Sequence, residues 1–390
     1  MSNSQSLDSA TDAGSQGTPI RRIGILTGGG DAPGLNPAIK AVVNAASARG
    51  WEVMGLYDGW QGLLGEAEPW LLDEVTVQKW DRDGGTQLGS SRTNPFSRRG
   101  PEGQKIDLSH QVLENLSRLG IDALVPIGGE DTLGVAARLI EKGVRIVGIP
   151  KTIDKDLQGT DYSLGFDTAV STCADLIERA HSPAGSHHFI QVVEVMGRHA
   201  GHLALWSGLA GGAFMTLIPE HDFVVDKMID LINAHLERGK RDRRFPRYGV
   251  IVVAEGAKPT GGHELTLDTR VDEFGHARLG GIGHYLSTTI KNRTKWDARS
   301  VLLGHPQRGG SPSPIDRNMG YLFGCAAVEA IAAGRFGTMV SARGIAPALQ
   351  LGLVPITEVR KGLNLVDVAH LYDTQHYRMK QGALLNSLGD

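Results

Sequence analysis

Short apolar runs alternate with helical patterns from Arg22 onward. Near the start, RRIGIL is followed by NPAIKAVVNAASARG and then by WEVMGLY. This order of strand, helix and strand is typical of a βαβ unit. Further runs that predict buried strands, each ending in glycine or in polar residues, are DALVPIGG, VRIVGIP, IQVVEVM, GVIVVAEG and SVLLGHP. We therefore expect an α/β fold with mostly parallel sheets, whose ligands bind at the strand ends.

The helix after the first strand has the clearest boundaries. Asn36 is predicted as its N-cap, Pro37 as its first helical residue and Gly50 as its terminator. Apolar residues recur on one face between these limits. The N-terminus of such a helix is an anion-binding site.

Composition limits the classes of function. The 390 residues suggest two domains or lobes, and polar residues 1–20 predict a disordered tail. A net charge of −3 gives no general attraction to nucleic acid or membranes. No apolar run is long enough to cross a bilayer. Cys173 and Cys325 lie outside any CxxC spacing and are expected to be free buried thiols, so we expect a cytoplasmic protein.

Three loops carry the candidate chemistry. TGGGDAPG, residues 27–34, lies between a strand and a helix, where glycines let backbone N–H groups approach phosphate closely. Taken alone, this loop could also be only a tight connection. IGGEDTLG, residues 127–134, adds Glu130 and Asp131, and acids beside a phosphate loop suggest a divalent cation. PKTIDKD, residues 150–156, combines a lysine, a threonine and two aspartates, and Asp154 is the candidate general base.

At this point a family resemblance becomes clear. GGGDAPG, GGEDT, PKTID, GTDYSLGFDTA, VVEVMGRHAG and LGHPQRGGSP stand in the order and approximate spacing of the 6-phosphofructokinase family, from Arg22 to about residue 355. Six ordered motifs are far more specific than any one of them. The resemblance implies two Rossmann-like α/β lobes, fructose 6-phosphate as acceptor, Mg²⁺ as cofactor, and a homodimer or homotetramer. It places the donor and magnesium lobe at residues 21–165 plus 307–357, and the sugar lobe at 166–306 plus 358–390.

The resemblance also assigns roles near the donor. It makes Asp154 the acceptor of the proton from the sugar 1-hydroxyl. The other positions are given these roles: sugar binding by Thr152 and Ile153, donor phosphate binding by Gly30, contact with the transferring group by Arg92, and the Mg²⁺ region by Glu130 and Asp156. Many relatives have aspartate where this chain has Glu130.

Sugar-phosphate contacts are implied further along the chain. They fall on Met196, Gly197, Arg198, Glu255, Arg299, His305, Pro306, Gln307 and Arg308. In the family, the arginine at the position of Arg299 reaches into a neighbouring subunit's site. In place of a second subunit-bridging arginine, this chain has Phe189. His187 or His188 could take over the role of that arginine, but the reading of each as an ordinary surface residue is favoured.

Two positions decide the phosphoryl donor. The resemblance implies that relatives that use ATP typically have glycine where this chain has Asp131 and Lys151. A carboxylate at Asp131 would oppose the α-phosphate of ATP sterically and by charge, and Lys151 would bind pyrophosphate or the departing phosphate. This pair resembles the pyrophosphate-dependent branch. The alternative is a local ion pair between the two with no effect on the donor.

We therefore expect Mg²⁺-dependent, reversible phosphoryl transfer from pyrophosphate to the 1-hydroxyl of fructose 6-phosphate. The catalytic group then comprises Asp154, Asp131, Lys151 and Arg92. An ATP-dependent enzyme is the first alternative, and a non-catalytic sugar-phosphate sensor is the second. The absence of GxGxxG after the first strand disfavours a nicotinamide-dependent dehydrogenase.

Overall fold

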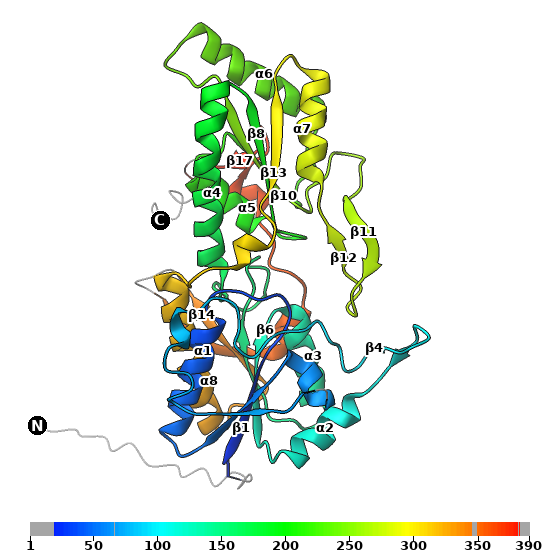
Figure 1. Ribbon diagram of the computed structural model, residues 1–390, viewed down its shortest axis with the longest axis vertical. Coiled ribbons are helices and arrows are strands. Elements are labelled where there is room, and N and C mark those ends of the chain that lie inside the picture. The colour runs from blue at the N-terminus through cyan, green and yellow to red at the C-terminus, as the bar shows by residue number, and fades with distance from the viewer. Residues whose placement is uncertain (1–18, 66, 345–348, 381, 383–390) are drawn as a thin grey trace, which may run out of the picture.

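Two mostly parallel sheets, one in each of two lobes that follow each other along the long axis of the molecule, organise the fold (Figure 1). The computed structural model describes residues 19–65, 67–344, 349–380 and 382. Almost all of the tail predicted over residues 1–20 lies outside this part of the chain. The α/β class predicted from the sequence is confirmed.

The first sheet has seven strands in the order β15-β14-β7-β6-β1-β2-β3. Neighbours from β14 to β2 are parallel, whereas the outermost strands β15 and β3 pair antiparallel. In chain order the strands are β1 (Arg22–Thr27), β2 (Glu52–Leu56), β3 (Trp70–Leu72), β6 (Ala123–Gly128), β7 (Val147–Pro150), β14 (Thr338–Arg343) and β15 (Gln350–Pro355).

Helices cover both faces of this sheet, and each face has its own apolar core. On one side lie α1 (Leu35–Ser47) and α8 (Pro314–Ala332), and on the other α2 (Ser109–Arg118) and α3 (Glu130–Ile140) (Figure 1). Helices α1 and α8 approach closely because α8 has glycines at the contact. A Cβ at Gly324 would lie 2.6 Å from the carbonyl oxygen of Ala38.

The second sheet has four parallel strands in the order β13-β8-β10-β9. They are β8 (Ile190–Val195), β9 (Met215–Leu217), β10 (Gly249–Ala254) and β13 (Ala298–Leu302). Packed around them are α4 (Phe166–His187), α5 (His202–Ala210), α6 (Val225–Arg241) and α7 (Ile282–Arg293). No helix in the described ranges is both long and apolar enough to cross a membrane.

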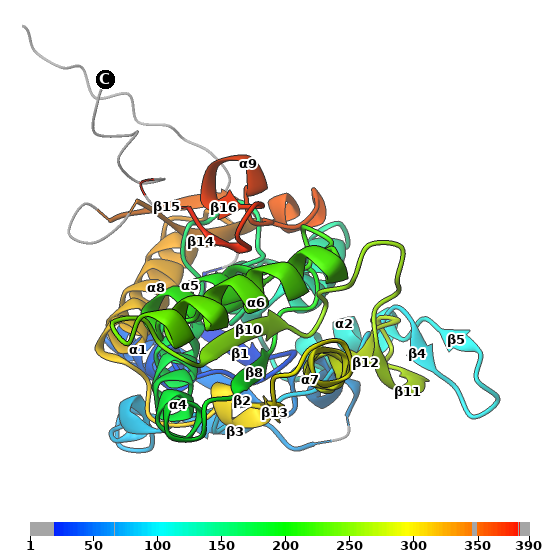
Figure 2. The same cartoon turned by 90° about the horizontal axis from the view of Figure 1, so that it is seen from above.

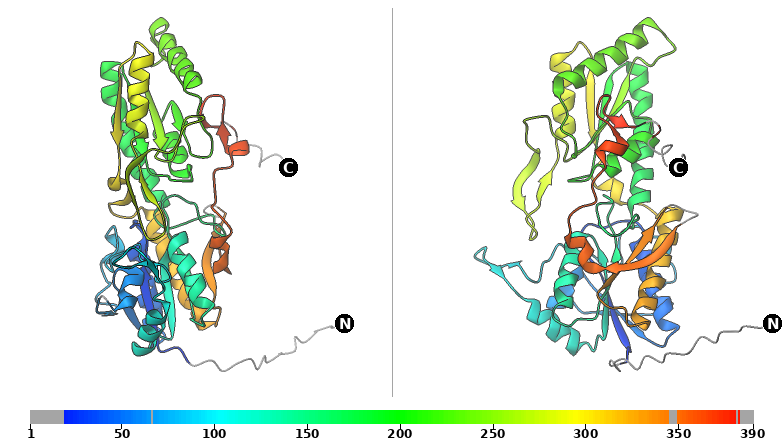
Figure 3. Two further views of the ribbon diagram at one scale, coloured as in Figure 1. Left: turned by 90° about the vertical axis from the view of Figure 1, so that its right-hand side faces the viewer. Right: turned by 180° about the vertical axis from the view of Figure 1, so that it is seen from behind.

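Smaller elements connect and extend the lobes. The hairpin of β11 (Thr266–Val271) and β12 (Ala277–Leu279) extends from the second lobe toward the first, beside the hairpin of β4 (Arg98–Arg99) and β5 (Lys105–Ile106) (Figure 2). After β15 the chain returns to the second lobe through α9 (Val368–Leu371), β16 (Tyr372–Asp373) and β17 (Arg378–Met379) (Figure 3). Short 3-10 helices are η1 (Gly59–Leu64), η2 (Trp80–Arg82), η3 (His305–Arg308) and η4 (Ile356–Arg360).

Two local predictions were wrong. Helix α1 begins at Leu35 after Gly34, whose φ of 105° suits glycine, so Asn36 is not the N-cap. The Asn36 side chain instead donates to the carbonyl oxygens of Asp83 and Gly84. The run SVLLGHP is not a buried strand, because β13 lies at the sheet edge and its residues after Ala298 are exposed.

The lobe boundaries derived from the resemblance stay a prediction.

Both cysteines are free, Cys173 being buried and Cys325 half-buried.

Candidate active site

A pocket forms where loops at the carboxyl ends of the two parallel sheets meet. From the first lobe come the loops after β1, β6 and β7, and from the second come the loop after β8 and the β11–β12 hairpin. Its lining is mostly glycine and charged residues: Gly29, Gly30, Arg92, Gly129, Glu130, Asp131, Thr132, Lys151, Thr152, Asp154, Asp156, Arg198, His199, His276, Arg308 and Leu363. We call it the central pocket. It contains all seven of the predicted donor, metal and catalytic positions, together with Thr152, Arg198 and Arg308 from the predicted substrate-binding set.

Hydrogen bonds and close packing with neighbouring residues fix the conformation of the glycine loop after β1. Gly29 has a φ of 78°, its N–H donates to the Ser91 carbonyl (3.0 Å) and its own carbonyl accepts from Ser90 Oγ (2.5 Å). A Cβ at Gly30 would lie 2.6 Å from Nη1 of Arg308, so glycine is required there for the arginine to approach. These bonds also fix the segment that carries Arg92 beside the loop.

Lys151 closes the floor of the central pocket. Its side chain is 3% exposed, and Nζ donates to the carbonyl oxygens of Gly28 (3.0 Å) and Gly30. Burial, and next the charge of Arg308, lower the pKa of Lys151 to about 7. The lysine therefore fills the space behind the glycine loop and anchors it.

Helix α3 presents two carboxylates in its first turn, Glu130 and Asp131. Acids at this position are stabilised by the helix dipole. Asp131 Oδ2 lies 3.3 Å from Nε2 of His276, and this hydrogen bond raises the pKa of the imidazole. In the described part of the chain, Asp131 and Lys151 have these separate partners and are not paired with each other, so the local ion-pair alternative does not hold.

Asp154 lies at the centre of the cluster. Burial raises its pKa, which Arg308 and Arg198 lower in part. Its Oδ1 is buried and has no hydrogen-bond partner among the described residues. A buried acceptor without a partner is a feature that calls for a bound group. Burial, and next the charge of Asp154, raise the pKa of Asp156 to about 7.

The loop that carries Asp154 is fastened on both sides. Within the loop, the N–H of Asp154 donates to Thr152 Oγ1 (3.1 Å). Lys155 has a φ of 55°, which is unusual for a residue with a side chain. Asn364, from the segment that returns to the second lobe, donates Nδ2 to the Lys155 carbonyl (2.9 Å) and its N–H to the Asp156 carbonyl (2.7 Å).

Two carboxylates fit a magnesium ion. Glu130 and Asp156 lie close enough that the charge of Glu130 raises the pKa of Asp156. No cluster of three or more His, Cys, Asp and Glu side chains that could hold a metal is present among the described residues. Mg²⁺ commonly keeps several waters and binds through one or two carboxylates plus substrate phosphates. This donor set therefore suits Mg²⁺ better than a metal that needs a complete protein cage.

Several residues predicted to bind the sugar phosphate lie around the same centre. Arg308 donates Nη1 to the Asp31 carbonyl (3.0 Å) and packs against the sulfur of Met196. Burial, and next the charge of Asp154, raise the pKa of Glu255 to about 7. His305 lines an adjoining pocket that shares Gly29, Gly30, Arg92 and Arg308 with the central one.

Some predicted residues are not brought to the central pocket. Ile153 is buried in the apolar core. Gln307 is buried, accepts from the N–H of Met196 (3.0 Å) and donates to the Gly304 carbonyl (2.8 Å), so its amide supports the fold. Pro306 is exposed. Gly197 accepts a backbone hydrogen bond from Gly256.

Arg299 lies near the amino end of β13, away from the central pocket of its own chain. Its guanidinium stacks 4.3 Å from the ring centroid of buried Phe189. His187 and His188 lie at the end of α4 and are exposed.

Sequence reasoning missed three contributors to these pockets. His276 lies on a hairpin that no motif marked, although DEFG before it is a typical turn sequence. His199 lines the central pocket next to Arg198. Lys258 lines a further pocket together with Arg198 and His199, and so adds a cation on the side of the second lobe.

The fold and the pocket together define a two-lobed α/β protein with a pocket of glycine and charged residues at the carboxyl ends of its sheets. The family model for phosphofructokinase matches residues 22–331. The chain belongs to the phosphofructokinase family.

Relatives with both donor types are similar to this chain. A protein of Amycolatopsis mediterranei described as pyrophosphate–fructose 6-phosphate 1-phosphotransferase is 50% identical over 327 residues, or 83% of this chain and 91% of the relative. A protein of Chloroflexus aggregans described as ATP-dependent 6-phosphofructokinase is 44% identical over 347 residues, or 89% and 93%. A solved pyrophosphate-dependent phosphofructokinase of Marinobacter aquaeolei has a TM-score of 0.76 at 22% identity, over 95% of this chain and 91% of that one. This last likeness shows the fold alone.

Proposed function

We propose that the protein transfers a phosphoryl group reversibly from pyrophosphate to the 1-hydroxyl of fructose 6-phosphate, giving fructose 1,6-bisphosphate and phosphate. One observation carries the choice of donor. Asp131, held by His276, and buried Lys151 both line the central pocket, at positions where the family resemblance implies glycine in members that use ATP. Pyrophosphate–fructose 6-phosphate 1-phosphotransferases among the relatives support the same choice.

The donor argument is one of space and charge. A carboxylate at the N-terminus of α3 takes up the anion position that the helix would otherwise offer to a third phosphate. Negative charge there repels the α-phosphate of a nucleotide more than the shorter pyrophosphate, which ends before it. Lys151, on the floor of the pocket, gives positive charge to the remaining phosphates.

Asp154 is the proposed general base. In the forward direction, its carboxylate takes the proton from the sugar 1-hydroxyl while the O–P bond forms and the bridging P–O bond of pyrophosphate breaks. Phosphate leaves. The burial that raises the pKa of Asp154 brings it nearer to the working pH, where a general base is most effective.

Positive charge is arranged around the transferring group. Lys151, Arg92 and Arg308 all line the central pocket and can stabilise the equatorial oxygens as charge develops on them. Mg²⁺, held by Glu130 and Asp156, would supply further neutralisation of the phosphate charge when bound. Arg198 and Glu255 are assigned to the sugar phosphate and sugar hydroxyls.

ATP as donor is the second candidate, because relatives described as ATP-dependent 6-phosphofructokinase are 44% identical over most of the chain. Overall likeness thus does not separate the two donors. The choice between pyrophosphate and ATP as donor depends in this proposal on Asp131 and Lys151 within the pocket.

The reaction is tested in both directions with purified protein and Mg²⁺. We expect fructose 1,6-bisphosphate from fructose 6-phosphate and pyrophosphate, and pyrophosphate from fructose 1,6-bisphosphate and phosphate. Formation of neither product would refute the proposed reaction.

Assembly and location complete the proposal. A homodimer or homotetramer is supported by the edge strand β13, where Val301 and Leu302 are 41% and 52% exposed beside Arg299. The two free thiols support a reducing cytoplasm.

A further inference from the structure

The β11–β12 hairpin makes a set of polar contacts across the lobes. It leaves the second lobe and lies against the first, near β4 and α3 (Figure 1). Its turn places Asp272 2.7 Å from Nη1 of Arg92 and Glu273 3.2 Å from Nη1 of Arg98. His276 reaches Asp131 on α3.

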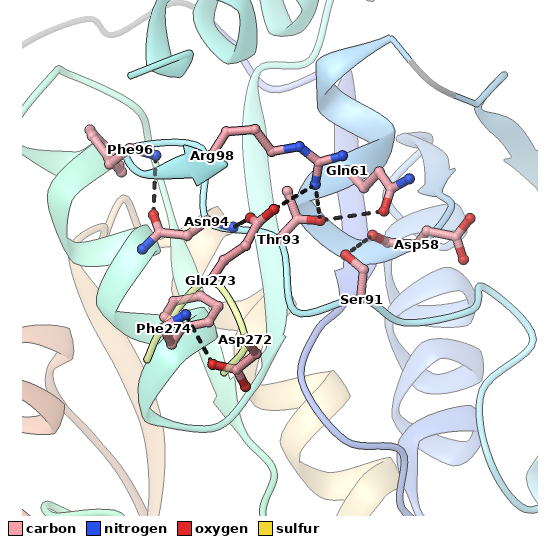
Figure 4. Close-up of polar contacts among 10 residues, drawn as sticks. All are labelled: Asp58, Gln61, Ser91, Thr93, Asn94, Phe96, Arg98, Asp272, Glu273 and Phe274. Carbon is pink, nitrogen blue, oxygen red and sulfur yellow. Dashed lines mark hydrogen bonds and ion pairs between the residues drawn. The ribbon is translucent and has the colours of Figure 1, made fainter. Parts of the chain in front are cut away.

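One of these contacts serves docking alone. Glu273 points between the backbone of Asn94 and the guanidinium of Arg98 (Figure 4), and its second oxygen accepts from the N–H of Asn94 (2.9 Å). Asn94 and Arg98 do not line the central pocket. Glu273 therefore fastens the turn to the first lobe without touching the site.

The other two contacts fall on residues of the central pocket. Asp272 uses Oδ1 to build the turn, accepting from the N–H groups of Phe274 (3.0 Å) and His276 (2.9 Å). Its Oδ2 is left for Arg92, whose side chain is 47% exposed. An arginine this exposed has many rotamers in water, so a fixed carboxylate orients it and leaves its other N–H groups for phosphate.

His276 orients the side chain of Asp131, just as Asp272 orients that of Arg92. The carboxylate of Asp131 is partly exposed in the first turn of α3, with 32% of its side chain accessible. His276 comes from the opposite lobe, and its hydrogen bond keeps that carboxylate in one orientation at the edge of the pocket. Without this bond, the carboxylate could rotate toward water and leave the space open.

From these contacts we propose that the hairpin positions the donor site and that His276 is the positioning residue that sets selectivity for pyrophosphate over a nucleotide. This inference rests on the proposed function. Asp131 provides the obstacle to a longer donor, and His276 keeps the obstacle in place. The sugar phosphate is assigned to other residues, Arg198 among them, and no hydrogen bond joins Arg198 to His276 among the described residues.

The test compares His276→Ala with His276→Gln and Glu273→Gln in the full-length protein. KM and kcat are measured for pyrophosphate, ATP and fructose 6-phosphate, with the melting temperature as a check on folding. In His276→Ala we expect the ratio of kcat/KM for pyrophosphate to that for ATP to fall about tenfold, the effect of one lost charge-assisted hydrogen bond. KM for pyrophosphate rises, whereas KM for fructose 6-phosphate stays within twofold of wild type, on the order of measurement scatter.

The two other variants separate positioning from folding. Glutamine can still donate to Asp131, so His276→Gln restores most of the selectivity. Glu273→Gln removes a charge from a neighbouring residue but keeps an oxygen that can accept from Asn94, so the turn stays docked and the ratio of the two donors is unchanged. Calorimetric titration of each protein with pyrophosphate and Mg²⁺, without sugar, gives a second measure that does not need turnover: His276→Ala binds more weakly than His276→Gln.

Two results overturn the inference. One is a donor ratio and a pyrophosphate affinity in His276→Ala equal to wild type. The other is an equal rise in KM for pyrophosphate and fructose 6-phosphate, which indicates a general disturbance. Measurements on the wild-type protein distinguish a failure of this inference from a failure of the proposed function. If wild type turns over ATP but not pyrophosphate, the proposed function itself is refuted.

Discussion

At the scale of single residues, burial sets the chemistry of the site. Asp154, Asp156 and Glu255 lie close together, and burial raises the pKa of each carboxyl. The same burial lowers the pKa of Lys151 to about 7. Groups with shifted pKa values gathered in one pocket are typical of catalytic sites. This gathering of shifted groups supports the acid and base roles proposed for the pocket.

The role of Asp154 is tested by Asp154→Asn. The amide has the same shape but cannot accept the proton, so kcat should fall at least about 10²-fold, within the usual range for a general base. Steady-state kinetics with pyrophosphate measure this. The melting temperature should not fall, because the substitution removes a buried charge whose Oδ1 has no partner among the described residues. A kcat within tenfold of wild type, on the order of a minor contribution, would remove Asp154 from this role.

Donor choice is tested by the double substitution Asp131→Gly and Lys151→Gly. Removing both side chains opens the space that ATP needs and takes away a charge that opposes it. The selectivity ratio of kcat/KM for pyrophosphate over ATP should fall at least about tenfold, or 1.4 kcal/mol. KM for fructose 6-phosphate serves as the internal control. An unchanged ratio means that the pair has no part in donor choice.

At the scale of elements, the loop after β7 depends on the segment that returns from β15. Asn364 bonds to the carbonyls of Lys155 and Asp156, and its own carbonyl lies 3.1 Å from Nε2 of His202 at the start of α5. His202 is 5% exposed, and burial lowers its pKa to about 4. The loop after β7, the returning segment and α5 are thus joined by one network of hydrogen bonds.

Because His202 is neutral in this hydrogen-bond network, the free energy of unfolding is predicted to fall at acid pH. The unfolded protein protonates His202 near its ordinary pKa of about 6.5, whereas the folded protein does so only near 4. The stability from neutral His202 is therefore complete above pH 6.5 and is lost as the pH falls toward 4. Between pH 7 and 5, wild type should lose about 2 kcal/mol more than His202→Gln, which is insensitive to pH at this position. Urea unfolding at both pH values measures the difference, and equal losses would contradict the assignment.

The sequence predicted elements better where patterns are local than where contacts are distant. The alternation of strand and helix patterns located β1, β6 and β10, because buried parallel strands are continuous apolar runs. It failed at β13, since an edge strand and a central strand can have the same composition. The N-cap of α1 was misplaced because Gly34 adopts a left-handed φ and Asn36 bonds to a distant loop.

The site shows the same division. The motifs placed Asp154, Lys151 and Asp131 in one pocket, because each follows a parallel strand that ends at the same edge. They could not place His276, which comes from the other lobe 145 residues after Asp131 and whose only local signal is a turn. Gln307 was predicted to face the sugar, but its amide is taken up by Met196 and Gly304.

At the scale of the whole molecule, we propose that a single chain does not hold a complete site and that Arg299 serves the site of a neighbouring subunit. It lies on an exposed edge strand with Val301 and Leu302, away from the central pocket. Closed symmetric assembly would bring such an edge against a second copy. In the proposed oligomer, Arg299 would supply a cation to the site of a neighbour.

Complementation between subunits tests this sharing. Arg299→Ala and Asp154→Asn are each expected to be nearly inactive alone. When the two are co-expressed, random pairing into dimers makes half of them hybrids with one intact site, so about a quarter of wild-type activity should return. No recovery in hybrids that have been shown to form would contradict shared active sites.

The central claim is that Asp131 and Lys151 make this member of the phosphofructokinase family use pyrophosphate. The most direct test is kcat/KM for pyrophosphate and for ATP on one preparation of wild-type protein, with saturating fructose 6-phosphate and Mg²⁺. We predict a preference for pyrophosphate of at least about 10²-fold, or 2.7 kcal/mol. Equal use of the two donors, or a preference for ATP, would contradict the account.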